Sequence, residues 1–571
     1  MCAINEQVHC DVCVAGAGLA GVSAAIAAAE QGCSVLLLSL GNTLSGSSFF
    51  PGSWGLGLIA PASDTDQESL LTKILEVGCG MAEPPLARVL VQHIGAEIER
   101  LAHWGIAFRM PEGIGTDRTL IPCFDDQYRM WRGLLYPSMT AVFQKKIQDL
   151  GIRTLAGEAA LQTIGTDGTV RGLLTMDSRG GVRSVYCHAL VLATGGMAGL
   201  FRHKIPTNDI SCLGQAIALE AGAALQNIEF MQFIPAYIKP AYQTIFNERT
   251  FKFAQFCGTE TSLLEPYLAE YNAELRNGRQ LTEQAVLEER SGHGPFSSRL
   301  PGKLVDFMLY ETHCRSGEGV PVRFTPAINS GEAGMMINDY FAWLEKTKGI
   351  STDTPVYIAP FFHASNGGIK IDISGSTGIP GLFACGECSS GMHGADRIGG
   401  LSTANSLVFG RRAGSAAAEY ALDSGNRSCR QSATEAVGAE AAAALQQQPA
   451  INIQELEMIR TEMQTVMYDN AAIIRTAQGL ESAAVRIREL RDRLRYSRSS
   501  QQSEDTGAAV QKLQMLTRQL LVAEGMIKVM LARRESRGSH YRADYPHEDE
   551  TQSHRIMLRL QAGEPVASSA Q

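Results

Sequence analysis

The chain has 571 residues, which at roughly 150 residues per domain allows about four compact units and excludes a short peptide or a metal-stapled module. Hydrophobic residues make up 45% and charged residues 19% of the chain, values that exclude wholesale disorder and a fibrous repeat. The net charge of −9 disfavours nonspecific binding to nucleic acid or anionic lipid.

The 13 cysteines are an odd number in a chain too large to need disulfide bonds, so we expect a reducing, cytoplasmic compartment. The N-terminus shows neither a basic segment nor a signal-cleavage motif, so we do not expect secretion. The uncharged stretch 12–29 is long enough to span a membrane, but it is mostly Ala and Gly. We interpret it as a strand, a turn and a helix.

The first predicted unit is a strand over 9–15, a helix over 22–31 that Gly32 ends, and a second buried strand over 33–40. Gly16, Gly18 and Gly21 form a G-x-G-x-x-G turn between the first strand and the helix. In this context the glycines predict dinucleotide binding rather than a merely structural turn, because they let a pyrophosphate approach the positive end of the helix.

One element of this dinucleotide-binding pattern is missing. An acidic residue is expected about 20 positions further on, at the end of the second strand. Ser39 occupies that place instead. Its hydroxyl can still meet a ribose, but it binds more weakly than a carboxylate.

The glycine- and serine-rich stretch 45–58 has no periodicity, and we expect a loop that covers a bound molecule. Turn signals at 166–168 and 179–181 predict hairpin strands between 151 and 196, ending in a buried strand that enters Thr194-Gly195-Gly196. The region that follows mixes aromatic with charged residues and lacks the glycine turns of the first unit, and we interpret it as an inserted cap. Three apolar stripes at helical spacing predict a bundle near the C-terminus. The predicted organisation is a nucleotide domain in two parts, 1–235 and 355–423, around a cap at 236–354, then a linker at 424–450, a helical domain at 451–545 and a tail at 546–571.

Two further strand-to-turn junctions, Ala193-Thr194-Gly195-Gly196 and Ala384-Cys385-Gly386-Glu387, are more than a simple NAD domain needs. With the first motif they resemble the flavoprotein pattern of the succinate dehydrogenase and fumarate reductase superfamily, which includes L-aspartate oxidase. The resemblance extends through most of the chain and is weakest over 236–354. The further matching segments are Glu229-Phe230-Met231-Gln232-Phe233, His393-Gly394-Ala395-Asp396-Arg397, Met467-Tyr468-Asp469-Asn470 and Arg534-Glu535-Ser536-Arg537.

The resemblance implies an α/β fold: a Rossmann-like FAD-binding domain split by an α+β capping domain and followed by a helical domain. It implies FAD as the cofactor, bound noncovalently, because the loop that carries a flavin-linking histidine in some relatives contains none here. Ser402 and its neighbours would begin a helix whose amides face the flavin, where reduced flavin carries negative charge. The cofactor-binding residues expected on this basis are Gly16, Gly18, Gly21, Ser39, Ser47, Gly52, Thr194, Gly195, Gly196, Glu387 and Ser402.

By the same resemblance the chain transfers hydride between flavin N5 and a carboxylate-activated C–C bond of a small organic acid. His363 and Arg397 match the substrate-binding His and Arg of the superfamily, and Arg299 is the candidate for its proton-delivering Arg. Such an Arg is protonated at all ordinary pH values, so it would need a nearby acid that the sequence does not identify.

The substrate end departs from the superfamily, because its Gln-Phe-His-Pro segment ends here in Ile234-Pro235. We therefore expect an acid whose second end is less polar than that of fumarate or aspartate. L-aspartate oxidase-like chemistry remains an alternative. Another is a flavoprotein subunit that passes electrons to an iron–sulfur or other electron-transfer partner. An inactive FAD-binding module is a third. We expect no nucleic acid partner, no direct membrane insertion and no metal.

Two Cys-x-x-Cys pairs, Cys10 with Cys13 and Cys385 with Cys388, raise the possibility of zinc or redox chemistry. We expect neither, because side chains three apart on a strand face opposite sides and the second pair overlaps the flavin motif.

Overall fold

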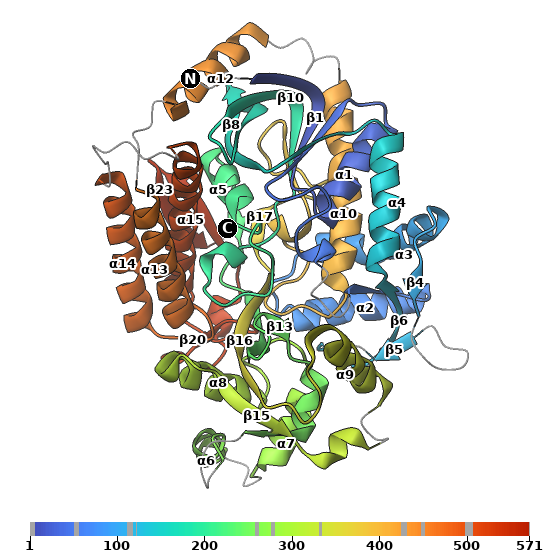
Figure 1. Ribbon diagram of the computed structural model, residues 1–571, viewed down its shortest axis with the longest axis vertical. Coiled ribbons are helices and arrows are strands. Elements are labelled where there is room, and N and C mark those ends of the chain that lie inside the picture. Colours follow the sequence, from blue (N-terminus) through green and yellow to red (C-terminus); the bar gives the residue numbers. More distant parts are fainter. Residues whose placement is uncertain are drawn as a thin grey trace.

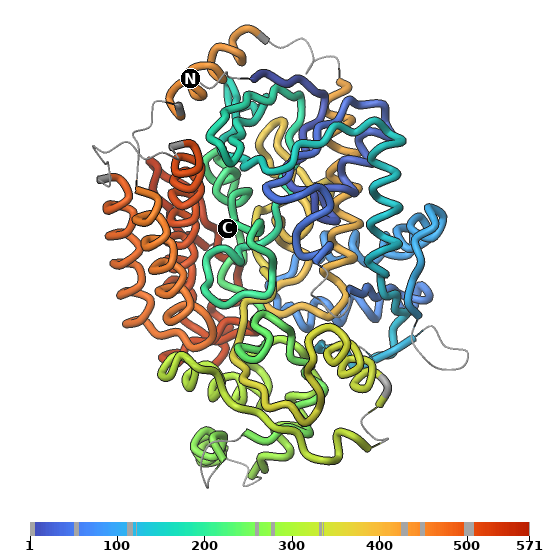
Figure 2. Tube along the Cα trace, in the orientation of Figure 1, coloured from blue at the N-terminus to red at the C-terminus, as the bar shows by residue number. Residues whose placement is uncertain are grey.

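The computed structural model describes residues 6–50, 56–110, 118–120, 123–256, 262–275, 280–330, 334–423, 431–446, 452–496 and 506–569. Three parts are visible in Figure 1: the predicted nucleotide-binding part around β1 and β10, the predicted cap with α6 to α9 at one end, and a bundle of α13, α14 and α15 along one side. The tube in Figure 2 follows the chain from the nucleotide-binding part into the cap, back again, and finally into the bundle. The expected fold class is therefore confirmed.

The predicted strand–helix–strand unit is present as β1 (Glu6–Ala15), α1 (Leu19–Glu30) and β2 (Val35–Ser39). All five residues of β2 are buried, as expected for a strand that is covered on both faces. The parallel strands β1 and β2 belong to a sheet of order β7-β2-β1-β10-β9-β8, in which β18 also pairs with β10. The remaining bounds are β7 Arg153–Ala156, β8 Glu158–Thr166, β9 Thr169–Asp177, β10 Val182–Leu192 and β18 Leu382–Ala384.

The hairpin turn predicted between β8 and β9 is confirmed. Thr166 pairs with Thr169, and the two residues between them, Asp167 and Gly168, have φ of 51° and 72°. Positive φ at both central residues is the geometry that fits the twist of a two-residue hairpin.

A long helix, α10 (Leu401–Leu422), packs directly on α1. The helices approach closely because α10 carries glycines at the contact. A Cβ at Gly410 would lie 2.6 Å from the carbonyl oxygen of Ala20, and one at Gly414 would lie 2.2 Å from that of Ala24. The backbones therefore touch without intervening side chains.

Smaller elements flank this core. The stretch expected to be a loop ends in β3 (Leu56–Ala60), which pairs with β6 (Tyr128–Leu134), so only residues 45–50 of it are described as loop and short helix. The sheet also contains β4 (Phe108–Arg109) and β5 (Arg118–Leu120). Nearby helices are α2 (Asp64–Val77), α3 (Pro84–His103) and α4 (Tyr136–Asp149).

The cap is built on a five-stranded sheet of order β13-β12-β16-β15-β14. Its strand β12 (Met231–Lys239) crosses the expected boundary at 235/236, and β16 (Val356–Ser365) returns beside it in antiparallel register. The other cap elements are β13 Thr244–Ile245, β14 Ala254–Phe256, β15 Val320–Phe324, α6 Glu265–Glu274, α7 Glu283–Arg290, α8 Lys303–Ser316 and α9 Met335–Lys348.

The three predicted apolar stripes form α13 (Ile453–Ala471), α14 (Ala477–Tyr496) and α15 (Thr506–Ala532). In each stripe the predicted Leu, Ile and Met positions are buried, including Leu456, Leu480 and Leu516. A short parallel pair, β20 (Ile474–Arg475) and β21 (Tyr541–Arg542), joins the bundle to its following segment.

Two expectations for the C-terminal third need correction. The expected linker contains α12 (Gln431–Gln446), which buries Ala442 and Leu445 and packs on β8 and β10. The expected tail forms the hairpin β22 (Ile556–Gln561) and β23 (Glu564–Ser569) in a sheet with β11 (Leu225–Gln226), β17 (Gly368–Lys370) and β19 (Ser389–Ser390). Both segments bury apolar side chains against distant parts of the chain, and local composition does not reveal such contacts.

The alternation expected for Cys10 and Cys13 is also wrong. The N–H groups of Asp11 and Val12 both donate to the carbonyl of Ser34, at 2.9 and 3.1 Å, so the regular hydrogen bonding between β1 and the residues at the start of β2 is interrupted here. The thiols of Cys10 and Cys13 lie close enough to interact. The pKa of Cys13 is accordingly raised well above its ordinary value, first by the Cys10 thiol and then by Cys187.

A buried histidine pair joins the three parts of the molecule. His313 on α8 and His203, in the segment before α5 (Leu213–Glu220), approach to 2.9 Å between their Nε2 atoms, and Tyr468 on α13 packs edge-on against both rings. Burial lowers the pKa of His203 to about 3 and that of His313 to about 4. Both rings are therefore neutral near pH 7.

We predict that Gly414→Ala destabilises the protein by about 1–3 kcal/mol, because the added methyl group overpacks against the backbone of α1. Thermal or urea unfolding measures the effect. Gly95→Ala on α3 is the matched control, since its Cβ would meet nothing within 4 Å, and it should stabilise by about 0.5–1 kcal/mol through helix propensity. Equal effects of the two substitutions would contradict the packing argument.

We also predict a loss of stability on acidification. Because the folded-state pKa values of His203 and His313 lie below the ordinary value, the unfolded chain takes up protons as pH falls through about 6.5 and the folded chain does not. Between pH 7 and pH 5 each ring should cost about 2 kcal/mol.

Urea unfolding of wild type and His313→Asn at pH 7 and pH 5 measures this effect. The variant should lose about 2 kcal/mol less than wild type on acidification. His103→Asn, at an exposed position on α3, is the control and should keep the wild-type pH dependence. A His313→Asn variant with the wild-type pH dependence would contradict the assignment.

Candidate functional site

A cavity of about 300 Å³ opens where the predicted motifs meet. It is lined by residues from the first glycine turn, the end of β2, the loop at 45–50, the turn after β10, the turn after β18 and the start of α10. The predicted residues that line it are Gly16, Gly18, Ser39, Ser47, Thr194, Gly195, His363, Glu387, Arg397 and Ser402. Gly21, Gly196 and Arg299 are not among the lining residues, and Gly52 lies outside the described residues.

The first glycine turn has the backbone geometry that a dinucleotide site requires. Gly16 has φ of 115°, and a Cβ there would lie 2.2 Å from the carbonyl of Ala193. Gly18 has open space beside it, with only the Ser45 carbonyl within 4 Å. A Cβ on Gly21 would lie 1.8 Å from the carbonyl of Gly16. The three glycines thus provide the tight turn, the ligand approach and the helix–strand packing, respectively.

The second and third junctions hold each other in place. A Cβ on Gly196 would lie 2.3 Å from Oε1 of Glu387, so this glycine makes room for the carboxylate. Oε1 of Glu387 accepts a hydrogen bond of 2.9 Å from the backbone N–H of Ser365. Burial raises the pKa of Glu387 above its ordinary value, and the hydrogen bonds from Ser365 and Gly196 act in the opposite direction.

Two helix N-termini face the cavity without side-chain caps. The N-cap of α1 is Gly18, and that of α10 is Gly400, with φ of 79°. Gly400 is thus the N-cap, and α10 begins at Leu401 with Ser402 in its first turn at the cavity wall, as expected. Uncapped amides and the helix dipole favour negative charge at both places.

A hydroxyl chain lies at the end of β2. The Ser39 and Ser45 hydroxyls are 3.1 Å apart, and the Ser45 hydroxyl donates to Oδ2 of Asp209 at 2.8 Å. All three residues line the cavity. Ser39, which stands where an acidic residue is expected, thus lies near other polar groups, and one of these is the Asp209 carboxylate from a distant loop.

Arg397 is a buried cation with a neutral partner. Its side chain is held by Gln232, whose Oε1 accepts from Nη2 at 2.5 Å and whose Nε2 donates to the Arg397 carbonyl at 3.3 Å. Among the described residues no carboxylate forms an ion pair with it. Burial lowers the pKa of Arg397 below its ordinary value. A guanidinium desolvated in this way would be stabilised by an anionic ligand.

His363 lines the cavity in its neutral form. Burial, and secondarily the charge of Arg397, lower the pKa of His363 to about 3. Its Nδ1 is buried and has no hydrogen-bond partner among the described residues. His363 can therefore donate or accept a hydrogen bond but carries no charge near pH 7.

Arg299 approaches this region from the cap and is paired with a buried acid. Its Nε and Nη2 atoms both lie 3.1 Å from Oδ2 of Asp396, which also accepts a 2.7 Å hydrogen bond from Ser297. Burial is the largest single influence and would lower the pKa of Arg299, but Asp396, together with Cys79 and Glu548, raises it above its ordinary value. Burial raises the pKa of Asp396. Arg299 does not line the cavity, and its guanidinium stacks over Phe124 at 5.7 Å.

The position of Ile234 lies within an apolar cluster. Ile234 pairs in register with Phe361 and packs with Ile205, Ala236 and Ala359, and Ile245 packs against this group. Ile205 and Ile245 also line the cavity. One wall of the cavity is therefore aliphatic.

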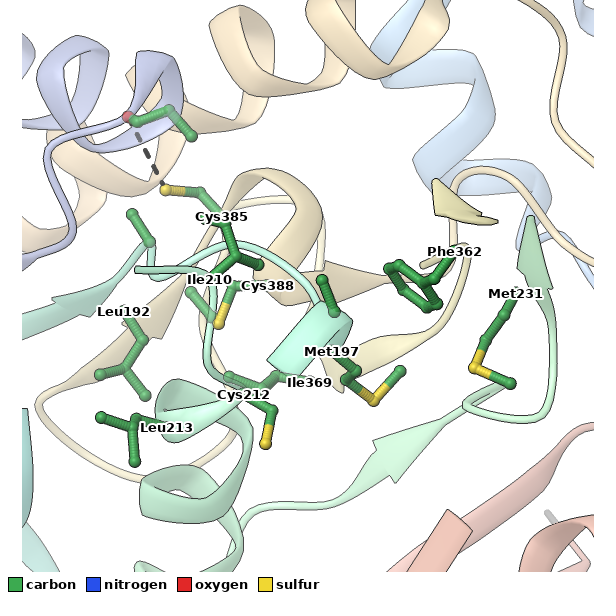
Figure 3. Close-up of a cluster of buried hydrophobic side chains, with 14 of the residues drawn as sticks. Leu192, Met197, Ile210, Cys212, Leu213, Met231, Phe362, Ile369, Cys385 and Cys388 are labelled. Carbon is green, nitrogen blue, oxygen red and sulfur yellow. Dashed lines mark hydrogen bonds between the residues drawn. The ribbon is translucent and has the colours of Figure 1, made fainter. Parts of the chain in front are cut away.

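The side chains of the second cysteine pair, Cys385 and Cys388, point in different directions, as Figure 3 shows. Sγ of Cys385 lies 3.9 Å from the Ala20 carbonyl on α1, whereas Sγ of Cys388 lies 3.4 Å from Oγ1 of Thr194.

Within the described ranges, no group of three or more His, Cys, Asp or Glu side chains is arranged to hold a metal ion. No helix of the described chain is long and apolar enough to cross a membrane.

Sequence reasoning missed Asp209 and Asp396 as site residues. Asp396 stands next to Arg397 in a motif already identified, so its neighbourhood was a usable signal. Asp209 lies 170 positions after Ser39, and nothing in the local pattern connects the two.

Comparisons with known proteins agree with this geometry. Residues 11–254 and 312–403 match a family model described as an FAD binding domain, and residues 460–566 match one described as the fumarate reductase flavoprotein C-terminus. The chain is 26% identical to a fumarate reductase flavoprotein subunit of Haemophilus influenzae, covering 95% of this chain and 91% of the relative. It is 29% identical to an L-aspartate oxidase of Mycobacterium tuberculosis, covering 96% and 95%.

A solved structure of quinol fumarate reductase from E. coli has a similar fold. The TM-score is 0.80 at 24% identity, with 99% of this chain and 97% of that chain covered. At this identity the likeness concerns the fold.

Proposed function

This chain belongs to the succinate dehydrogenase and fumarate reductase flavoprotein superfamily, and from that membership we propose that it transfers hydride at a carboxylate-activated C–C bond of a small organic acid. It is an FAD-dependent oxidoreductase. When bound, FAD supplies a two-electron donor or acceptor in its isoalloxazine ring. The glycine turn, the uncapped helix ends and the cavity between them fit this cofactor.

The proposal depends most on Arg397. A buried guanidinium whose hydrogen-bond partner is an amide, at the wall of the cavity, can donate hydrogen bonds to one carboxylate of a substrate. Gln232 holds this residue in place, because its Oε1 accepts from the guanidinium and its Nε2 donates to the backbone carbonyl of Arg397. Neutral His363 lines the same cavity and would orient the substrate by a hydrogen bond from or to its ring.

Arg299 is the proposed proton donor on the cap side. Because it stays charged, a proton that it gives up must be replaced, and Asp396 is the acid in contact with it. Oδ1 of Asp396 is buried without a hydrogen-bond partner in the described chain, so this carboxyl group has an oxygen left on which to hold a proton. Movement of the cap toward the cavity would bring Arg299 to the reacting carbon.

The proposed substrate is an organic acid with one carboxylate for Arg397 and a less polar second end. Support comes from the aliphatic wall of Ile205 and Ile245, backed by Ile234. Leaving a second carboxylate against this wall without a hydrogen bond would cost about 1.5–3 kcal/mol. L-aspartate oxidase-like chemistry is the second candidate, favoured by the relative of that name at 29% identity.

A role as one subunit of a larger complex is also proposed. Several relatives are named flavoprotein subunits, and the chain spans nearly their whole length. An iron–sulfur or other electron-transfer protein would then be the partner.

The cytoplasm is the proposed location, supported by the free thiols of all ten cysteines in the described ranges.

We predict that Arg397→Gln keeps a wild-type FAD content but lowers kcat/KM by about 100-fold or more, because the buried positive charge that binds the carboxylate is lost. The absorbance ratio of flavin to protein and anaerobic flavin reoxidation by a panel of unsaturated acids measure the two quantities. Arg411→Gln, which removes a half-exposed partner of Glu30, is the control and should keep activity. An Arg397→Gln variant with wild-type turnover would remove Arg397 from the site.

We further predict that FAD is released intact by acid precipitation. The loop residues 45–50 that line the cavity contain no histidine to form a covalent flavin link. Absorbance of the supernatant and of the redissolved pellet checks this. Yellow colour retained in the pellet would show that the attachment is covalent.

A further inference from the structure

The end of β2 lacks the carboxylate that this position usually provides in a Rossmann-like unit, where it binds the ribose of the adenosine half of the cofactor. Ser39 stands there, nearly fully buried and at the cavity wall. Its hydroxyl donates to the carbonyl of Asn42 at 2.9 Å. The single proton of Ser39 is thus used within the protein, and toward a ribose this residue is only a neutral acceptor.

A carboxylate reaches the same place from another part of the chain. Asp209 lies in the loop before α5, and its Oδ2 accepts a 2.8 Å hydrogen bond from Ser45, which itself contacts Ser39. A Cβ on Gly41, two residues after β2, would lie 3.1 Å from the same oxygen. The carboxylate therefore occupies the space immediately beyond the end of β2.

The loop that carries Asp209 is fixed on several sides. The Thr207 hydroxyl donates to Oδ1 of Asp209. The Nε2 group of Gln243 donates to the carbonyls of Ile205 and Pro206, at 3.0 and 3.2 Å, and the N–H of Ile205 donates to the Phe362 carbonyl at 2.8 Å. The carboxylate is thus held in position before any ligand binds, which lowers the entropy cost of binding.

Asp209 is also the carboxylate that remains available. The lining residues of the described chain include three carboxylates: Glu158, Asp209 and Glu387. Glu158 is paired with Arg183 and accepts a 2.7 Å hydrogen bond from Thr175, and Glu387 is bound to backbone N–H groups. Asp209 accepts from two hydroxyl groups and forms no ion pair in the described ranges, so its oxygens retain acceptor capacity toward a ligand.

We propose that Asp209 supplies the carboxylate that binds the ribose hydroxyls of the adenosine half of FAD, in place of the residue at the end of β2. Ser45 positions it by donating to Asp209, and the Ser39 hydroxyl lies 3.1 Å from that of Ser45, so the carboxylate is held next to the end of β2. The inference rests on the FAD binding that family membership establishes.

The experiment compares FAD with FMN, which has the same flavin ring but lacks the adenosine half. Apoprotein is titrated with each ligand, and binding is followed by quenching of flavin fluorescence. Asp209→Asn should weaken FAD binding by about tenfold or more, the usual effect of losing a hydrogen bond to a charged group, and should change FMN binding less than about twofold. Asp11→Asn is the matched control, because Asp11 accepts a 2.7 Å hydrogen bond from Ser34 at the opposite end of β2. It should leave both affinities unchanged.

A second variant separates a binding role from a structural one. In Ser39→Glu combined with Asp209→Ala, a carboxylate returns at the end of β2, and the FAD affinity should recover relative to Asp209→Ala alone. Equal losses for FAD and FMN in Asp209→Asn, or an unchanged FAD affinity, would overturn the proposal. A wild-type chain that binds neither flavin would contradict the proposed function instead, so the two failures are distinguishable.

Discussion

The site depends on the parallel alignment of three strands. Ala15 on β1, Leu192 on β10 and Ala384 on β18 are paired in one row across the sheet, although they lie far apart in the sequence. Each is followed within a few residues by a glycine-containing turn. Because parallel strands end at the same edge, the three turns meet at one point, and the cavity lies between them. A shift of one residue in any of the three strands would move its turn out of this row.

The electrostatics of the cavity follow from burial. Desolvation keeps His363 uncharged, while the guanidinium of Arg397 retains its charge against a neutral amide. The two helix ends add further positive potential without adding a counter-ion. Such a site is least stable when it holds no anion, so part of the free energy of ligand binding comes from relieving the unpaired charge.

Much of this arrangement could be predicted from local pattern. The glycine turn after β1 and the apolar stripes of α13, α14 and α15 each carry their signal within one element, and the structure has both. The predictions failed where the determining contact lies elsewhere in the chain. The helix α12 and the hairpin β22–β23 are held by distant packing, and the interrupted hydrogen bonding at Asp11 involves the carbonyl of Ser34 in a different part of the chain. Asp209 became visible as the partner of Ser45 only once the chain was folded, whereas Asp396 stood in an identified motif and only its contact with Arg299 needed the structure.

The cap enters and leaves on neighbouring strands. Ala236 on β12 pairs with Ala359 on β16, so more than a hundred residues begin and end within one ladder of hydrogen bonds. Since the ends are already joined, the chain entropy of closing the excursion changes only slowly with its length. Evolution can therefore lengthen, shorten or exchange this excursion while the strands that carry Gln232 and His363 keep their register. New substrate preferences can arise in this way without rebuilding the flavin half of the enzyme.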